Sequence, residues 1–204
     1  MKQVIRMDEI TKKHEGTTVL QGLNLVIHQG DVVGFIGEKK KRAILMQLLS
    51  GEIMPCEGDI YYGNTRLGLY GQTPEYVGVY TSPIGFLCEF DGFKNLKYIA
   101  GMNERAGEDE IVQSMEFVGL NPASKLKVEK FTKRMIQKLS VAQAIMEGQE
   151  ILLLDADLFT EGNEANHAEM RKIIRKLKKF GLTIVLTSEK EEYVKNVCTK
   201  LYQL

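Results

Sequence analysis

The stretch GDVVGFIG at residues 30–37, with the helical run that follows and closes on LLSG at residues 48–51, decides the fold of this chain. Its apolar residues are continuous, which is typical of a strand buried on both faces. The strand ends at Gly37, and apolar residues fill the segment from Ala43 to Leu49. We therefore predict a buried strand, a turn at Gly37, and a helix over 43–49 that ends at Ser50 and Gly51.

Other segments repeat this alternation of buried strand and helix. Residues 150–155 and 182–187 are continuous apolar runs, which favours two more strands of a parallel sheet. The residues between them that recur at helical spacing are Met170, Ile173, Ile174, Leu177 and Phe180, and they predict an amphipathic helix. Early strands are expected at 4–7 and 23–27, and short strands and turns over 59–80. The order predicts an α/β fold with a mostly parallel core sheet.

The middle of the chain has a helical pattern. Met135, Leu139, Ala142 and Met146 follow one another at steps of four, three and four, which places them on one helix face. We expect a helical sub-domain at about 85–147, inserted into a core formed by 1–84 and 148–204. The whole of residues 1–204 is then one domain, as the length also suggests.

Composition excludes several classes of protein. Lys and Arg number 27 and Asp and Glu number 27, so we expect no nucleic-acid partner, because phosphate binding needs a positive surplus. Cys56, Cys88 and Cys198 are scattered, which favours thiols in a reducing compartment. The chain has no apolar run of 18 residues and no signal-peptide pattern. We expect a cytoplasmic protein.

The order of these motifs resembles the ATP-binding cassette, the nucleotide-binding subunit of ABC transporters in the P-loop NTPase superfamily. The resemblance rests on 30–37, 48–51, the run ILLLD at 151–155 and the run TIVLTS at 183–188. Residues 9–14 and 19–25 are similar to the opening hairpin of the family, and 95–100 and 117–120 to its helical sub-domain. The family implies an ABC ATPase fold with an N-terminal antiparallel β part. The pattern is most similar to cassettes of bacterial peptide-antibiotic or multidrug export and immunity.

The resemblance also implies cofactors and partners. These are ATP with Mg²⁺, a membrane permease and a second cassette chain in a homo- or heterodimer. It places the chain in the cytoplasm, peripheral at the inner face of the plasma membrane.

The phosphate-binding loop departs from the pattern G-x-x-x-x-G-K-[ST] of the superfamily. Gly37 is followed by Glu38, the three lysines 39–41, Arg42 and Ala43. Arg42 stands at the position of the phosphate lysine and Ala43 at that of the Mg²⁺-binding hydroxyl. No glycine remains after Gly37 to let the backbone wrap a phosphate.

Other positions implied by the family depart as well. Ala156 replaces the catalytic glutamate, Glu189 replaces the switch histidine, and Arg134 replaces the signature glycine after Thr132. Asp155 is retained where the family orients Mg²⁺, so it is the candidate for weak metal binding. We predict no catalytic residue. The vestigial nucleotide site comprises Gly37, Lys39, Lys40, Lys41, Arg42, Ala43, His14 at the adenine-stacking position, Ser82 at the glutamine position, and Asp155.

Alternatives remain for several of these features. The cluster 39–42 is either an anion site or a solvated loop, and its cations oppose the dipole of the helix that it opens. Ser188 and Glu191 have the spacing of a capping box, which gives the segment around Glu189 a purely structural interpretation. The basic residues of 171–179 are expected to form a solvated helix face.

Two functions follow from the resemblance. The first is an ABC transporter ATP-binding subunit with weak or absent ATP hydrolysis. The second is a non-catalytic pseudo-ATPase that acts as a scaffold or regulatory module.

Overall fold

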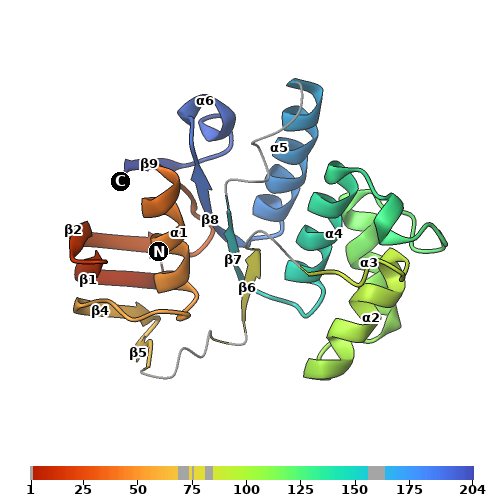
Figure 1. The fold of residues 1–204 in the computed structure, drawn as a ribbon, viewed down its shortest axis with the longest axis horizontal. Helices are drawn as coiled ribbons and strands as arrows, with labels where there is room; N and C mark the ends of the chain where they lie inside the picture. Colours follow the sequence, from red (N-terminus) through yellow and green to blue (C-terminus); the bar gives the residue numbers. More distant parts are fainter. Residues whose placement is uncertain (1, 69–73, 75, 81–84, 156–163) are drawn as a thin grey trace.

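A computed structural model of the protein describes residues 2–68, 74, 76–80, 85–155 and 164–204 (Figure 1). The strands are β1 (Gln3–His14), β2 (Thr17–His28), β3 (Val32–Ile36), β4 (Glu57–Tyr62), β5 (Thr65–Arg66), β6 (Val77–Tyr80), β7 (Ile151–Leu154), β8 (Thr183–Ser188) and β9 (Lys200–Gln203). The helices are α1 (Lys39–Leu49), α2 (Gly92–Asn103), α3 (Glu108–Val118), α4 (Lys133–Ile145), α5 (Glu164–Lys179) and α6 (Glu191–Val194), with a 3₁₀ turn at Val128–Lys130.

A parallel sheet forms the centre of the molecule. Its strand order is β6-β7-β8-β3-β9, and each neighbouring pair is parallel. Every residue of β3, β7 and β8 is buried. The continuous apolar runs therefore predicted these three strands correctly, because both faces of the sheet are covered.

An antiparallel sheet precedes it, with the order β2-β1-β4-β5. This confirms the expected N-terminal antiparallel part, but β1 and β2 are longer than the predicted runs at 4–7 and 23–27. The pairing of β1 with β2 contains several register shifts. Such shifts interrupt the alternation of buried and exposed residues, so the pattern concealed the true ends of the strands.

Two apolar cores lie on the two faces of the parallel sheet. One is formed with the antiparallel sheet and α1, and it includes Ile5, Phe35 and Leu153. The other lies against α4, α5 and the helices beside them, and it includes Leu152, Leu139 and Ile174. Figure 1 shows α1 between the two sheets and α2, α3 and α4 grouped at the opposite side of the molecule.

The helices of the middle segment begin and end at recognisable caps. The Asp91 carboxylate accepts from Lys94 N–H at 2.8 Å at the start of α2, and Thr132 Oγ1 accepts from Met135 N–H at 3.2 Å at the start of α4. Helix α4 packs so closely on β6 that a Cβ atom at Gly78 would lie 2.0 Å from the Ala144 carbonyl oxygen. This contact ties the helical group to the parallel sheet.

Three expectations about the C-terminal third need correction. Phe180 was expected on the apolar face of α5, but it follows the helix end and is 74% exposed. Arg171 was expected on the solvated face, but its side chain is buried and pairs with Glu164. The N-cap of α6 is Lys190 and not Ser188, whose hydroxyl accepts from Lys190 N–H at 3.3 Å. The predicted capping box is therefore wrong.

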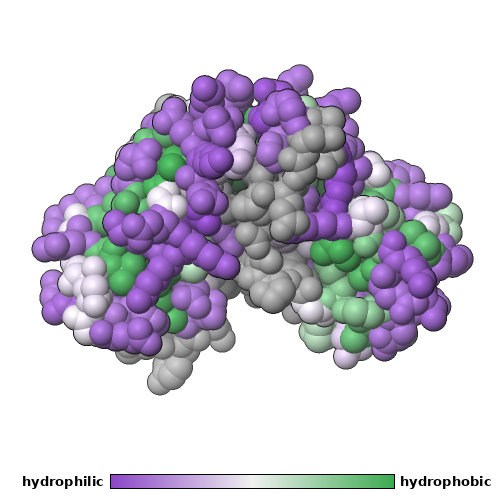
Figure 2. Space-filling model, turned by 45° about the horizontal axis from the view of Figure 1, so that its top comes forward, coloured by the Kyte–Doolittle hydropathy of each residue, from purple (hydrophilic) through white to green (hydrophobic). Residues whose placement is uncertain are grey.

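The surface mixes polar and apolar residues. On the face shown in Figure 2, hydrophilic residues predominate along the top and hydrophobic ones form smaller patches on both sides. Exposed large apolar side chains include Tyr98 and Met102 on α2. None of the described helices is both long enough and apolar enough to cross a membrane.

Candidate functional site

The carboxyl ends of β3, β7 and β8 meet at one edge of the parallel sheet. Register pairs Ile36 with Ser188, so Gly37 lies beside the end of β8, and its N–H donates to the Ser188 carbonyl at 3.3 Å. Thr187 Oγ1 donates to Asp155 Oδ1 at 2.7 Å, which joins the ends of β7 and β8. Ligands of open α/β sheets bind at this edge, so Gly37 and Asp155 occupy the expected place for a site.

The connection from β3 to α1 consists of Gly37 and Glu38. Helix α1 begins at Lys39 and not at Ala43, so the cluster 39–42 forms its first turn and is not a loop. Glu38 is extended, and its carbonyl accepts from Arg42 N–H at 3.0 Å. The sequence misplaced the helix start because four charged residues hide the apolar spacing that begins at Ile44.

Arg42 lies inside the fold. It is 5% exposed, and its Nη1 donates to the Gly37 carbonyl at 2.9 Å. Its Nε is also buried and has no hydrogen-bond partner among the described residues. The guanidinium therefore folds back over the start of its own helix, toward the chain that leads into it.

The other cations of the first turn face solvent. Lys39 and Lys40 are exposed and Lys41 is half-buried, while Ala43 presents only a methyl group. Lys40 Nζ lies 4.0 Å from Glu15 Oε2, and the same carboxylate oxygen lies 4.0 Å from His14 Nε2. Glu15 thus brings His14, at the end of β1, next to the start of α1.

Two predicted positions, Ser82 and Ala156, lie outside the described residues. Glu189 is exposed just after β8. Of the predicted set, the structure gathers His14, Gly37, Lys40, Arg42 and Asp155 around one edge of the sheet.

The comparisons with known proteins identify the family. A family model described as "ABC transporter" matches residues 20–157. This chain belongs to the ABC transporter family. It is a nucleotide-binding subunit of the P-loop NTPase superfamily.

Individual relatives support the same family. YybJ, an uncharacterized ABC transporter ATP-binding protein of Bacillus subtilis (strain 168), is 33% identical over 96% of this chain and 89% of its own length. BcrA, a bacitracin transport ATP-binding protein of Bacillus licheniformis, is 29% identical over 92% of this chain but only 62% of its own length. The chain thus spans most of the first relative and less than two thirds of the second.

Solved structures share the fold. CbiO1 of Clostridium perfringens, part of the ABC transporter complex cbiONQ, superposes with a TM-score of 0.87 at 17% identity, covering 100% of this chain and 85% of that one. A nucleotide-free ATP-binding cassette from an ABC transporter gives 0.85 at 18% identity, with coverage of 99% and 87%. These likenesses confirm the predicted ABC ATPase fold.

Asp155 is the described residue at the sheet edge that we predicted to bind a metal ion. Asp155 Oδ1 accepts from the Thr187 hydroxyl at 2.7 Å, and the Ala43 side chain has no oxygen. Among the residues that the structure describes, no three His, Cys, Asp or Glu side chains gather where they could hold a metal ion.

The side chains of the segment that resembles the ABC signature loop also make contacts within the chain. Thr132 caps α4, and Arg134 pairs with Glu169 on α5. The same Glu169 lies 2.7 Å from Lys138 Nζ. The pKa of the Lys138 ammonium is lowered, mainly by burial and to a smaller extent by the nearby charge of Arg134. Arg134, which we predicted to stand in place of the signature glycine, therefore contributes to intramolecular packing.

Sequence reasoning missed three of these partners. Glu15, Thr187 and Glu169 each bridge elements that are distant along the chain. For Thr187 a signal existed, since a polar residue at the end of one predicted parallel strand meets Asp155 at the end of its neighbour. For Glu15 and Glu169 the sequence shows only a charge of the appropriate sign.

Proposed function

We propose that this chain is the nucleotide-binding subunit of an ABC transporter, bound in the cytoplasm to a membrane permease, and that its own site does not hydrolyse ATP. The observation that carries the proposal is the short connection at Gly37 and Glu38, with the buried Arg42 guanidinium bonded to the Gly37 carbonyl.

A phosphate loop works by aiming successive backbone N–H groups and a cation at an anion. Here the Gly37 N–H donates to Ser188, the Arg42 N–H donates to Glu38, and the Arg42 guanidinium donates to Gly37. These three donors of the Gly37 and Arg42 region are therefore engaged within the chain. The missing hydroxyl at Ala43 also opposes Mg²⁺ binding.

The partner is proposed from the family. The relative named for bacitracin transport favours an export or immunity transporter as the assembly. The exposed cations Lys39 and Lys40 leave weak ATP binding without hydrolysis compatible with the proposal. A scaffold or regulator without a permease is the competing function.

Hydrolysis is tested by phosphate release from ATP and by titration calorimetry, each with and without Mg²⁺. We expect a rate equal to that of a buffer blank and no increase in binding heat on adding Mg²⁺. A Mg²⁺-dependent rate that Asp155→Ala abolishes and Asp109→Ala leaves intact would contradict the proposal. Asp109 is a suitable control because it is an exposed carboxylate at the start of α3.

Assembly is tested by purifying a tagged chain from detergent-solubilised membranes of its host. We expect an integral membrane protein in a fixed ratio to the chain. Recovery of the chain only from the soluble fraction would contradict the permease assignment and favour the scaffold.

A further inference from the structure

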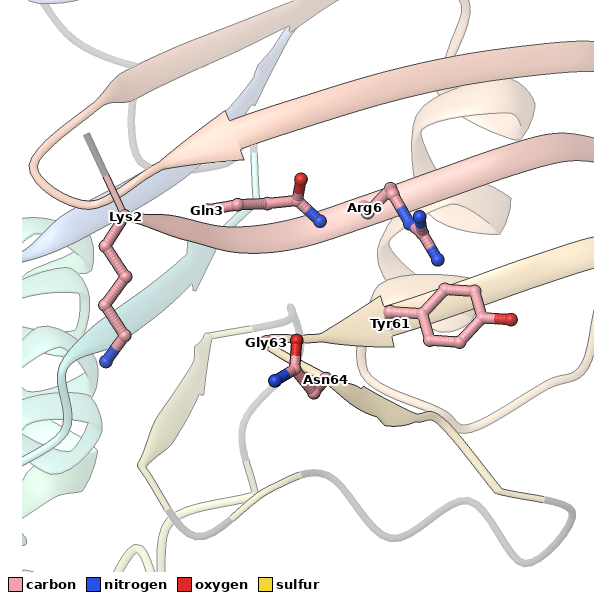
Figure 3. A pocket seen from close by; sticks show the side chains of 6 residues that line it. All are labelled: Lys2, Gln3, Arg6, Tyr61, Gly63 and Asn64. Carbon is pink, nitrogen blue, oxygen red and sulfur yellow. The ribbon is translucent and has the colours of Figure 1, made fainter.

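A cavity of about 620 Å³ lies in the antiparallel sheet, between the start of β1 and the end of β4. The residues that line it are Lys2, Gln3, Arg6, Tyr61, Gly63 and Asn64 (Figure 3). Gln3 and His14 stand at opposite ends of β1. A strand rises roughly 3.3 Å per residue, so Arg6 in the cavity lies on the order of 25 Å along β1 from His14.

A bulge in β1 shapes this cavity. Side chains alternate along a regular strand, so residues three positions apart would face opposite sides. The pairing of β1 with β2 shifts register between Gln3 and Ile5, and both Val4 and Ile5 are buried. Gln3 and Arg6 consequently line the same cavity, with Tyr61 and Asn64 opposite them in Figure 3.

The Arg6 guanidinium is held in place before any ligand arrives. It lies 4.4 Å from the centre of the Tyr61 ring, and its Nε lies 3.2 Å from Asp8 Oδ2. Register places Arg6 directly opposite Tyr61 across β1 and β4. The side chain is nevertheless 40% exposed. A preorganised guanidinium loses less entropy when it binds an anion than a mobile one does.

The rest of the lining supplies hydrogen-bond donors and no acid. Lys2 adds a second exposed cation, and Gln3 and Asn64 add two side-chain amides. In the described part of the chain, none of these three side chains has a hydrogen bond or an ion pair. The Gly63 N–H is already used, since it donates to the Val4 carbonyl at 2.9 Å.

We propose that this cavity binds an oxyanion, either a phosphate or a carboxylate group, between Arg6, Lys2 and the amides of Gln3 and Asn64. Charge-assisted hydrogen bonds from two cations favour such a group over a neutral ligand. The oxyanion comes from a free phosphate ion or from the acidic side chains of a peptide segment. The site is independent of nucleotide binding at the edge of the parallel sheet.

The test is an NMR titration of the full-length ¹⁵N-labelled chain at constant pH and ionic strength, with inorganic phosphate in one arm and triglutamate peptide in the other. We expect saturable shifts of the Gln3, Gly63 and Asn64 amides with at least one probe. The probe that binds identifies the source. The double variant Lys2→Gln/Arg6→Gln should weaken binding at least tenfold. Lys2→Gln/Asn64→Ala keeps the contact between the Arg6 guanidinium and the Tyr61 ring, and it provides the same test if the first variant does not fold.

Two charge-matched variants complete the experiment. Lys13→Gln/Lys94→Gln removes two exposed cations outside the cavity, and Lys39→Gln/Lys40→Gln removes two from α1. Both should retain the shifts at Gln3, Gly63 and Asn64. The proposal is overturned if neither probe shifts these amides, or if the cavity variants bind as well as the unchanged chain. Shifts confined to the Gly37 region that vanish in Lys39→Gln/Lys40→Gln would overturn it as well.

Discussion

Arg42 and the phosphate-loop lysine predicted for its position carry the same charge on side chains of different shape. A lysine ends in a compact ammonium, whereas the planar fork of an arginine can bond a carbonyl close to its own backbone. In this chain the fork reaches the Gly37 carbonyl. The replacement is visible in the sequence, but the inward direction of the side chain depends on the short connection before α1.

Asp31 links the start of β3 to β9. Burial opposes ionisation of its carboxyl, but hydrogen bonds from Lys200 Nζ at 2.9 Å and from His28 N–H at 3.1 Å outweigh burial and lower its pKa. A lowered pKa in the folded state means that the stabilisation is complete above the ordinary pKa of about 4 and is lost as the pH falls below it.

We therefore expect Asp31→Asn to lower the free energy of unfolding at neutral pH, and the difference from the unchanged chain to shrink as the pH falls below about 4. Urea unfolding at a series of pH values measures this. Asp109→Asn, at an exposed position, should show no such convergence. A difference that stays constant with pH would mean that the Asp31 ion pair does not contribute.

Helices α4 and α5 are joined by Glu169, which pairs with Arg134 and Lys138. Glu169→Gln removes the carboxylate and leaves two cations facing each other. We expect a loss of roughly 1–3 kcal/mol in the free energy of unfolding, as for hydrogen bonds to charged groups. Urea unfolding measures the loss, and high salt should reduce it by screening the two cations. Glu116→Gln, at an exposed position of α3, is the control and should change stability little.

The contact between β6 and α4 depends on a glycine. A Cβ atom at Gly78 would lie 2.0 Å from the Ala144 carbonyl oxygen, whereas one at Gly101 in α2 meets open space. Gly78→Ala should destabilise the chain by roughly 1–3 kcal/mol or more through overpacking. Gly101→Ala should stabilise it by up to about 1 kcal/mol through helix propensity. Equal thermal unfolding midpoints for the two variants would refute the close approach.

Across the whole molecule, the two apolar cores share the parallel sheet as their common wall. Leu152 and Leu153 are adjacent in β7 and fully buried, yet they belong to different cores. Truncating either one to alanine should cost roughly 2–5 kcal/mol. Because the sheet couples both cores, we expect each variant to unfold in one transition.

Circular dichroism and tyrosine fluorescence, in a chain without tryptophan, should report the same midpoint for each of these variants. Midpoints that separate between the two probes in one variant would show that the cores unfold independently. Leu126→Ala, at an exposed leucine, is the control for the substitution itself.

The sequence predicted the strands of the parallel sheet well and the details of the site less well. The runs at β3, β7 and β8 are continuous because both faces of the sheet are covered, which is a local signal. The predicted start of α1 at Ala43 was four residues too late, because the charged residues 39–42 conceal the first turn of the helix. Phe180 was assigned to the apolar face of α5, although it lies just past the helix end. Helix ends and exposed faces depend on neighbours that local spacing does not describe.

The sequence by itself determined the α/β class, the order of the main elements, the resemblance to the family and the absence of glycine from residues 38–50. Those properties follow from which residues occur and at what spacing. Only the tertiary structure decided that Arg42 turns inward to Gly37, that Glu15 lies between His14 and Lys40, and that a bulge sets Gln3 and Arg6 around one cavity. The physical reason is that side-chain direction depends on strand register and on packing between segments far apart in the chain.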